Sequence, residues 1–180
     1  RAGLEMALLD ALTQQHRISL STFLGGGNAE LHTDMTIPAG DLAHAQRSAV
    51  AIAARGIRAA KVKIGASSVE EDIERLCAIH AAAPSLRLVV DANTSHDLPT
   101  ARKFLQHVRE NRLPVALYEQ PLPRGDLPAW RTLTAESKEV PICADESART
   151  PADVIALIRH DAAHVINIKF MKSGVLESWD

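Results

Sequence analysis

The stretch AKVKIGASSVEEDIERLCAIHAAAPSLRLVVDAN (60–93) contains two short apolar segments separated by a segment rich in helix-forming residues. The first apolar segment carries Lys61-Val62-Lys63 and the second ends in Asp91-Ala92-Asn93. Between them, Ser68 is a suitable N-cap for a helix over 69–82. A strand, a helix and a second strand in this order form a unit whose two strands run parallel. This stretch therefore predicts an α/β fold.

The same unit recurs along most of the chain. A first helix is predicted over 2–15, where Leu4, Leu8 and Leu12 recur with helical spacing and form an apolar stripe. Strands alternating with helices beyond this point predict a parallel sheet. The predicted strands are 31–37, 59–64, 86–90, 115–118, 140–144 and 165–168, and the helices between them are 41–54, 69–82, 97–110, 126–137 and 151–159.

Composition excludes several classes of protein. The 180 residues are 46% hydrophobic and 23% charged, with a net charge of −2. A nucleic-acid-binding protein would show a basic surplus, and a disordered chain would be less hydrophobic. No apolar run approaches the ~18 residues of a membrane span. The two cysteines, Cys77 and Cys143, have neither disulfide-scaffold nor zinc spacing, so a reducing compartment, the cytoplasm, is expected.

Charged residues follow one predicted strand after another, although buried parallel strands are normally apolar throughout. A doubly wound sheet of the dinucleotide-binding type would need a Gly-rich first turn, which the run 25–27 does not provide. A (β/α)8 barrel brings successive strand ends round a common mouth. We therefore expect a TIM-type barrel, incomplete here at about six strands. The charged residues are Lys61, Lys63, Asp91, Glu119, Asp145 and Lys169.

Three carboxylates at one mouth predict a bound cation. Asp91, Glu119 and Asp145 cannot all stay ionised near one point without a counter-ion. An all-oxygen ligand set suits Mg²⁺ or Mn²⁺, which stabilises a developing enolate as a Lewis acid. A lysine near that cation has a lowered pKa and can act as a general base. Lys63 and Lys169, on opposite sides, could remove a proton from one face of a carbon and return it to the other.

At these residues the sequence resembles the enolase superfamily, in the branch of muconate-lactonizing enzymes and dipeptide epimerases. The resemblance runs along nearly the whole chain, and the order and spacing of the motifs agree as well. The matching segments are KVKIG (61–65), VVDAN (89–93), YEQPLPRGDL (118–127), PICADES (141–147) and INIKFMKSG (166–174).

The resemblance implies a role for each of these charged residues. Lys63 and Lys169 would be the two bases and Lys61 would bind the substrate carboxylate. Asp91, Glu119 and Asp145 would hold Mg²⁺. Residues 1–28 would be the last helix of a capping domain and a connector, and residues 29–180 a partial barrel. Because two further strands and most of that capping domain are missing, we expect these 180 residues to be part of a longer protein.

The activity implied is that of an isomerase, an epimerase or racemase that moves a proton at the carbon next to a carboxylate. LHTDMTI (31–37) looks most like dipeptide epimerases acting on L-Ala-D/L-Glu, which makes Thr36 a substrate contact. The substrate would be a dipeptide or an N-acyl amino acid, with no nucleic-acid or membrane partner; a homo-oligomer is compatible with this.

Other activities remain open. The same lysines and carboxylates occur in o-succinylbenzoate synthase and N-acylamino-acid racemase, whereas muconate cycloisomerase fits less well. An inactive fragment with a binding or structural role is the alternative from another class. Two departures from the family pattern affect substrate identity: Thr94-Ser95-His96 replaces Gln-Gly-Trp beside the mouth, and one Gly rather than two follows Lys172.

Overall fold

A computed structural model of the chain describes residues 1–27 and 30–179. Helices and strands alternate over most of this length. In chain order they are α1 (Ala2–Gln15), α2 (Leu20–Phe23), β1 (Met35–Ile37), α3 (Leu42–Ala54), β2 (Ala59–Lys63), α4 (Val69–Ala82), β3 (Arg87–Asp91), α5 (Leu98–Glu110), β4 (Val115–Glu119), α6 (Leu127–Glu136), β5 (Ile142–Ala144), α7 (Pro151–Arg159), β6 (Val165–Ile166), α8 (Phe170–Ser173) and α9 (Leu176–Trp179).

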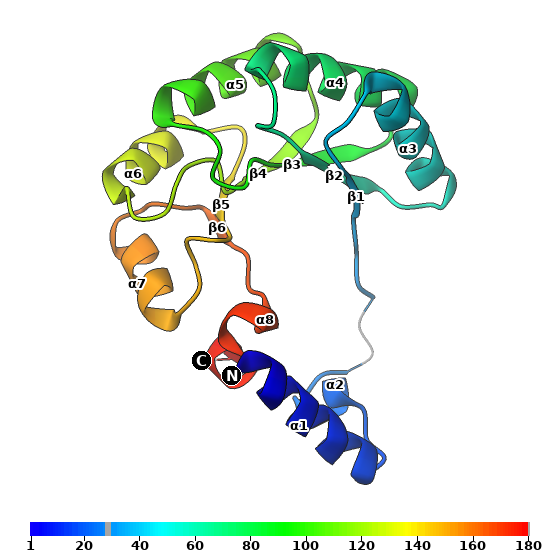
Figure 1. Cartoon of the computed structure of the whole chain (residues 1–180), viewed down its shortest axis with the longest axis vertical. Helices are drawn as coiled ribbons and strands as arrows, with labels where there is room; N and C mark the ends of the chain where they lie inside the picture. Colours follow the sequence, from blue (N-terminus) through cyan, green and yellow to red (C-terminus); the bar gives the residue numbers. More distant parts are fainter. Residues whose placement is uncertain (28–29, 180) are drawn as a thin grey trace.

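The strands form one six-stranded sheet in the order β1-β2-β3-β4-β5-β6, and every neighbouring pair is parallel. The sheet curves, and α3 to α7 cover its convex side in an arc (Figure 1). This is the arrangement of strands inside and helices outside that a barrel requires. The prediction of a parallel α/β fold of the barrel type is confirmed.

The hydrophobic core lies between the sheet and its outer helices. On β2, Ala60 and Val62 are fully buried, whereas Lys61 and Lys63 alternate with them and face the other side. Each outer helix turns its apolar face inward against the sheet. The largest fully buried side chains include Trp130, Tyr118, Phe104, Leu76 and Leu133. The convex face of the sheet, packed against the outer helices, therefore stabilises the fold. The concave face is available for polar side chains.

Local sequence signals account for the helix starts. Ser68 and Glu71 form a capping box at α4, and Thr150 and Asp153 form a second one at α7. Asp41 caps α3 through the backbone N–H of His44. The cap predicted at Ser68 is confirmed. Each cap fixes the residue at which a helix begins. It therefore also sets the length of the turn between that helix and the preceding strand.

Three predicted strands exceed the observed ones by two or more residues. The fifth, expected over 140–144, is limited to Ile142–Ala144. The first, expected over 31–37, is limited to Met35–Ile37, the residues that have partners on β2. Leu31 lies before this paired segment and is exposed. The sixth, expected over 165–168, pairs only at Val165 and Ile166. The first and the sixth are the outermost strands of the sheet, so each has a single neighbour to extend its ladder.

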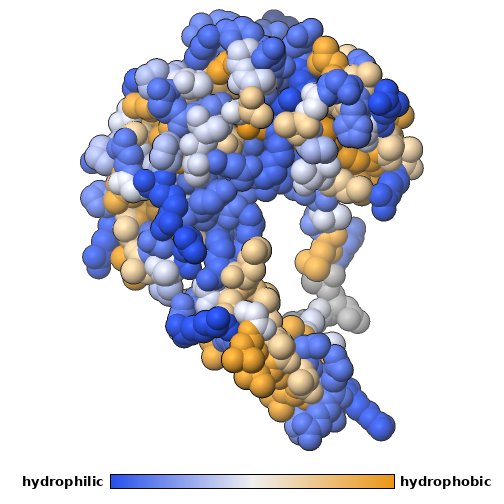
Figure 2. Space-filling model, in the orientation of Figure 1, coloured by the Kyte–Doolittle hydropathy of each residue, from blue (hydrophilic) through white to orange (hydrophobic). Residues whose placement is uncertain are grey.

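The first helix and the last two lie together away from the sheet (Figure 1). The Glu5 carboxylate of α1 accepts hydrogen bonds from the backbone N–H groups of Val175 and Leu176, at 3.1 and 3.2 Å. The apolar stripe of α1 is left in solvent, with Leu4 68% exposed, and apolar surface covers this region in Figure 2. None of the helices in residues 1–27 and 30–179 has the length and apolarity needed to cross a membrane.

Candidate active site

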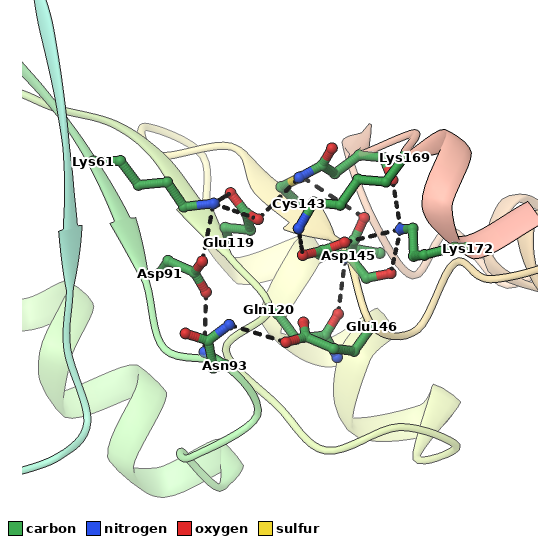
Figure 3. Close-up of polar contacts among 12 residues, drawn as sticks. Lys61, Asp91, Asn93, Glu119, Gln120, Cys143, Asp145, Glu146, Lys169 and Lys172 are labelled. Carbon is green, nitrogen blue, oxygen red and sulfur yellow. Dashed lines mark hydrogen bonds and ion pairs between the residues drawn. The ribbon is translucent and has the colours of Figure 1, made fainter. Parts of the chain in front are cut away.

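The predicted site residues gather along the carboxyl ends of the strands. Lys63 on β2 is in register with Asp91 on β3, and Asp91 with Glu119 on β4. Asp145 follows β5, and Lys169 lies three residues beyond β6 at the start of α8. Because neighbouring strands lie about 4.8 Å apart, the three carboxylates form a row across β3, β4 and β5. Figure 3 shows this row with Lys61 at one end and Lys169 and Lys172 at the other.

A first group of ion pairs occupies the β2–β4 end of the row. The Lys61 ammonium donates to both oxygens of Glu119, at 2.8 and 2.7 Å, and lies 2.9 Å from Asp91 Oδ2. The Lys63 ammonium donates to Asp91 Oδ2 at 2.7 Å and to Asn93 Oδ1 at 2.6 Å. Asp91 therefore contacts both lysines of β2.

A second group surrounds Asp145. The Lys169 ammonium pairs with Asp145 Oδ2, and Lys172 pairs with Oδ1 at 2.8 Å. Lys172 also donates to the backbone oxygens of Asp145 and Asn167, at 2.8 and 2.7 Å. The Asn167 amide donates to Glu119 Oε1 at 2.9 Å and so connects the two groups.

The four lysines differ in their access to solvent. Lys63 and Lys169 keep 34% and 38% of their side chains exposed, whereas Lys61 and Lys172 keep 15% and 13%. The two lysines predicted as bases are thus the two that a substrate in the concave face can reach more easily. Lys61 and Lys172 lie deeper, among carboxylate and carbonyl oxygens.

Burial and neighbouring charges act on the pKa values in opposite directions. Burial, reinforced by the charge of Asp91, raises the pKa of Glu119 despite its hydrogen bonds with Lys61. Burial opposes ionisation of Asp145 too, but hydrogen bonds from Lys169 and Lys172 outweigh it and lower that pKa. Burial would lower the pKa of Lys61, yet contacts with Glu119 and Asp91 raise it above its usual value. The ammonium form of Lys61 is therefore favoured by these contacts and is suited to holding an anionic group.

The donor set is chemically suited to a hard divalent cation. Asp91, Glu119 and Asp145 offer only oxygen, and their side chains are between 1% and 4% exposed. Within the described residues, no three acidic, His or Cys side chains lie close enough together to hold a metal as they stand. The charges of Asp91, Glu119 and Asp145 are instead neutralised by lysines. Binding Mg²⁺ would therefore replace ammonium–carboxylate ion pairs with metal–oxygen bonds.

Several polar residues of this site were not singled out from the sequence. Lys172 lies one helical turn after Lys169, and Asn167 lies two residues before Lys169. Gln120 directly follows Glu119. The buried Gln120 amide oxygen accepts from the backbone N–H of Asp145 and Ser147, at 2.8 and 3.1 Å, and so fixes the loop after β5. Asn167 and Gln120 directly follow strand ends and could have been found by inspecting those positions, whereas Lys172 lies six residues beyond β6.

Two other sequence-level assignments have different outcomes. Thr36 lies on the exposed edge strand β1, in register with Lys61, and its role as a substrate contact stays a prediction. His96, expected beside the mouth, is 4% exposed and hydrogen-bonds with the Tyr118 hydroxyl beneath it. His96 therefore lies in the loop that follows β3 at the mouth, as expected, but its imidazole turns inward against Phe104 and Tyr118 and is buried.

The fold and the row of ionisable groups are those of the barrel class, in which active sites lie at the carboxyl ends of the parallel strands. Residues 43–179 match the family model described as enolase C-terminal domain-like, and the chain belongs to this family.

Curated relatives carry the names of epimerases, which are isomerases. An aromatic dipeptide epimerase of Herpetosiphon aurantiacus is 49% identical over 177 residues, covering 98% of this chain and 49% of the relative. An L-Ala-D/L-Glu epimerase of Thermotoga maritima is 34% identical over 178 residues, covering 99% and 51%. The chain thus spans about half the length of these relatives.

Solved structures agree with the fold. A mandelate racemase/muconate lactonizing protein from Herpetosiphon aurantiacus superposes with a TM-score of 0.93 at 47% identity, covering 99% of this chain and 51% of that one. A dipeptide epimerase from Enterococcus faecalis, complexed with Mg and L-Leu-L-Tyr, superposes with a TM-score of 0.87 at 32% identity, covering 97% and 49%. The resemblance read from the sequence motifs is confirmed.

Proposed function

We propose that this chain carries the acid–base and metal-binding groups of a Mg²⁺-dependent dipeptide epimerase. The observation that carries the proposal is the position of two accessible lysines at opposite ends of one row of buried carboxylates. Lys63 contacts Asp91 at one end and Lys169 contacts Asp145 at the other. The names of relatives and of a dipeptide-bound neighbour support the substrate class.

Each group then has a chemical task. Asp91, Glu119 and Asp145 would hold the cation, which when bound stabilises the negative charge that develops on the substrate carboxylate. Lys61, whose ammonium lies between Glu119 and Asp91, would orient that carboxylate. Lys63 would accept the α-proton from one stereoisomer while Lys169 donates a proton to the opposite face, and the roles reverse in the other direction. Thr36 would contact the substrate from β1.

The finer assignments belong to the same proposal. L-Ala-D/L-Glu was expected from the motif at 31–37, and an aromatic dipeptide is named for a relative of higher identity. Both are dipeptides with a carboxylate next to the reacting carbon, so both fit the residues present. Mn²⁺ would substitute for Mg²⁺ in an all-oxygen site. Two free cysteines, Cys77 and Cys143, agree with action in the cytoplasm.

Solvent-exchange measurements test the two-base assignment. In D₂O, the full-length protein is expected to exchange the α-proton of both stereoisomers of L-Ala-Glu or of an aromatic dipeptide. Lys63→Ala should abolish exchange from one stereoisomer and Lys169→Ala from the other, because each removes the base for one face. Lys138→Ala, at a distant surface position, is the control. Wild-type epimerisation by both single variants would rule the assignment out.

A further inference from the structure

A buried ion pair on α4 lies outside the proposed catalytic machinery. Arg75 Nη2 is 2.7 Å from Asp72 Oδ1, and the side chains are 7% and 0% exposed. Removing two charges from water is costly, and their attraction repays that cost only when the geometry is good and the remaining polar atoms are hydrogen-bonded. Here the Arg75 Nε is buried without a hydrogen-bond partner. Stability is therefore a poor explanation for this pair.

The remaining side-chain hydrogen bonds of the pair reach the end of β2 and the turn that follows it. Arg75 Nη2 donates to the backbone oxygen of Lys63 at 2.6 Å. Asp72 Oδ2 accepts from the backbone N–H of Gly65 at 2.7 Å, and Oδ1 accepts from the Ser67 hydroxyl at 3.2 Å. Three positions of one short turn are thus bound to two adjacent buried charges. The first of these positions is the predicted base itself.

The opposite side of the same turn is also enclosed. Gly65 has a φ of +85°, and a Cβ at this position would lie 1.8 Å from Ser95 Oγ and 2.8 Å from Ser95 Cβ. The buried His96 lies behind it and hydrogen-bonds with Tyr118. The turn after β2 is therefore held between α4 and the loop after β3, and its backbone has little room to shift.

We infer that Asp72 and Arg75 are positioning residues that fix the backbone of Lys63 and so aim its ammonium at the substrate α-carbon. This inference rests on the proposed function. Lys169, at the other end of the row, has no contact with this pair among the interactions described, so the pair should act on one face of the reaction only. A displacement of about 1 Å at a reacting group can cost about 100-fold in rate.

The test compares the two stereoisomers, because the pair should affect proton exchange from only one of them. In the full-length protein, Lys63→Ala first identifies the stereoisomer whose α-proton exchange in D₂O depends on Lys63. Arg75→Met is then expected to slow exchange from this stereoisomer about 10- to 100-fold. Exchange from the other stereoisomer, which depends on Lys169, should stay close to the wild-type rate. Arg75→Lys keeps a buried cationic donor and should recover part of the loss.

Two further measurements keep the inference falsifiable. Asp72→Asn should speed hydrogen exchange of the Gly65 amide, which loses its ionic acceptor, whether or not the protein turns over substrate. Arg102→Met, which breaks the exposed pair with Glu136, is the matched control and should change neither measurement. If Arg75→Met does not fold, the comparison of stereoisomers is made with Arg75→Lys and Asp72→Asn.

The outcomes separate the two proposals. Equal losses from both stereoisomers, no loss from either, or an unchanged Gly65 amide would overturn the positioning role while leaving the proposed function standing. A wild-type protein that exchanges neither stereoisomer of any dipeptide would overturn the proposed function and the inference with it.

Discussion

At the scale of single residues, the charge of each carboxylate should determine how tightly the row binds a divalent cation. Asp145→Asn keeps the shape of the side chain but removes the charge that Lys169 and Lys172 now share. We expect the affinity of the full-length protein for Mn²⁺, a probe for Mg²⁺, to fall at least about 10-fold, and epimerisation to fall with it. Titration calorimetry measures the first quantity, and chelation of the wild type should abolish the second.

Glu139→Gln offers a matched control, since this carboxylate lies on the surface 3.6 Å from Arg109. It loses the same charge far from the row and should leave metal affinity unchanged. Full activity of the wild type after exhaustive chelation would contradict the metal assignment.

The sequence predicts which residues reach the strand ends better than it predicts what they touch. Strand periodicity places Lys61 and Lys63 on one face, and the structure agrees because Ala60 and Val62 fill the core side. It does not predict that Lys61 bridges Asp91 and Glu119, since that contact depends on side-chain torsions and on register across three strands. Lys172 was missed for a related reason: it comes from a short helix that pattern reading does not resolve.

At the scale of elements, the tight turn between β2 and α4 invites a direct test. Gly65 and Gly125 both have positive φ, but a Cβ would strike Ser95 at Gly65 and would meet nothing within 4 Å at Gly125. Gly125→Ala should therefore cost about 1–2 kcal/mol of unfolding free energy from backbone strain alone. Gly65→Ala should cost about 1–3 kcal/mol more, because Ser95 must move.

Urea denaturation of the two variants separates the steric cost from the strain that they share. Equal losses would show that the loop after β3 yields easily and that the turn is less confined than its contacts indicate. Element boundaries were predictable to within a few residues where a cap defines them, as at Ser68. The largest error is at the outer strand β1, where pairing with a single neighbour rather than local sequence sets the length.

At the scale of the whole molecule, exposed apolar surface should govern association. Leu4 and Leu8 of α1 are 68% and 63% exposed, and β1 and β6 each pair with only one described strand. Such surfaces and edges favour contacts between chains. We expect the 180-residue chain to self-associate as its concentration rises, and Leu4→Lys with Leu8→Lys to weaken this association.

Sedimentation velocity over a wide concentration range measures the effect, with Gln106→Lys combined with Ala135→Lys, at exposed positions of α5 and α6, as the charge-matched control. A chain that stays monomeric throughout would show that neither α1 nor the strand edges are adhesive. An equal response to the control would instead point to net charge rather than to the apolar stripe.

The order of the strands has a consequence for tolerance. Lys63 and Lys169 are attached to opposite ends of a run of five neighbouring strands, so the gap between their nitrogen atoms accumulates every inter-strand spacing and twist between them. One irregularity already lies within that run, a shift of register between Leu88 and Val89 on β3, and such bulges increase local twist. A small angular error far from both lysines would therefore be magnified at the substrate. The separation of the two lysines is therefore set by the geometry of all the strands between them and not by one local contact.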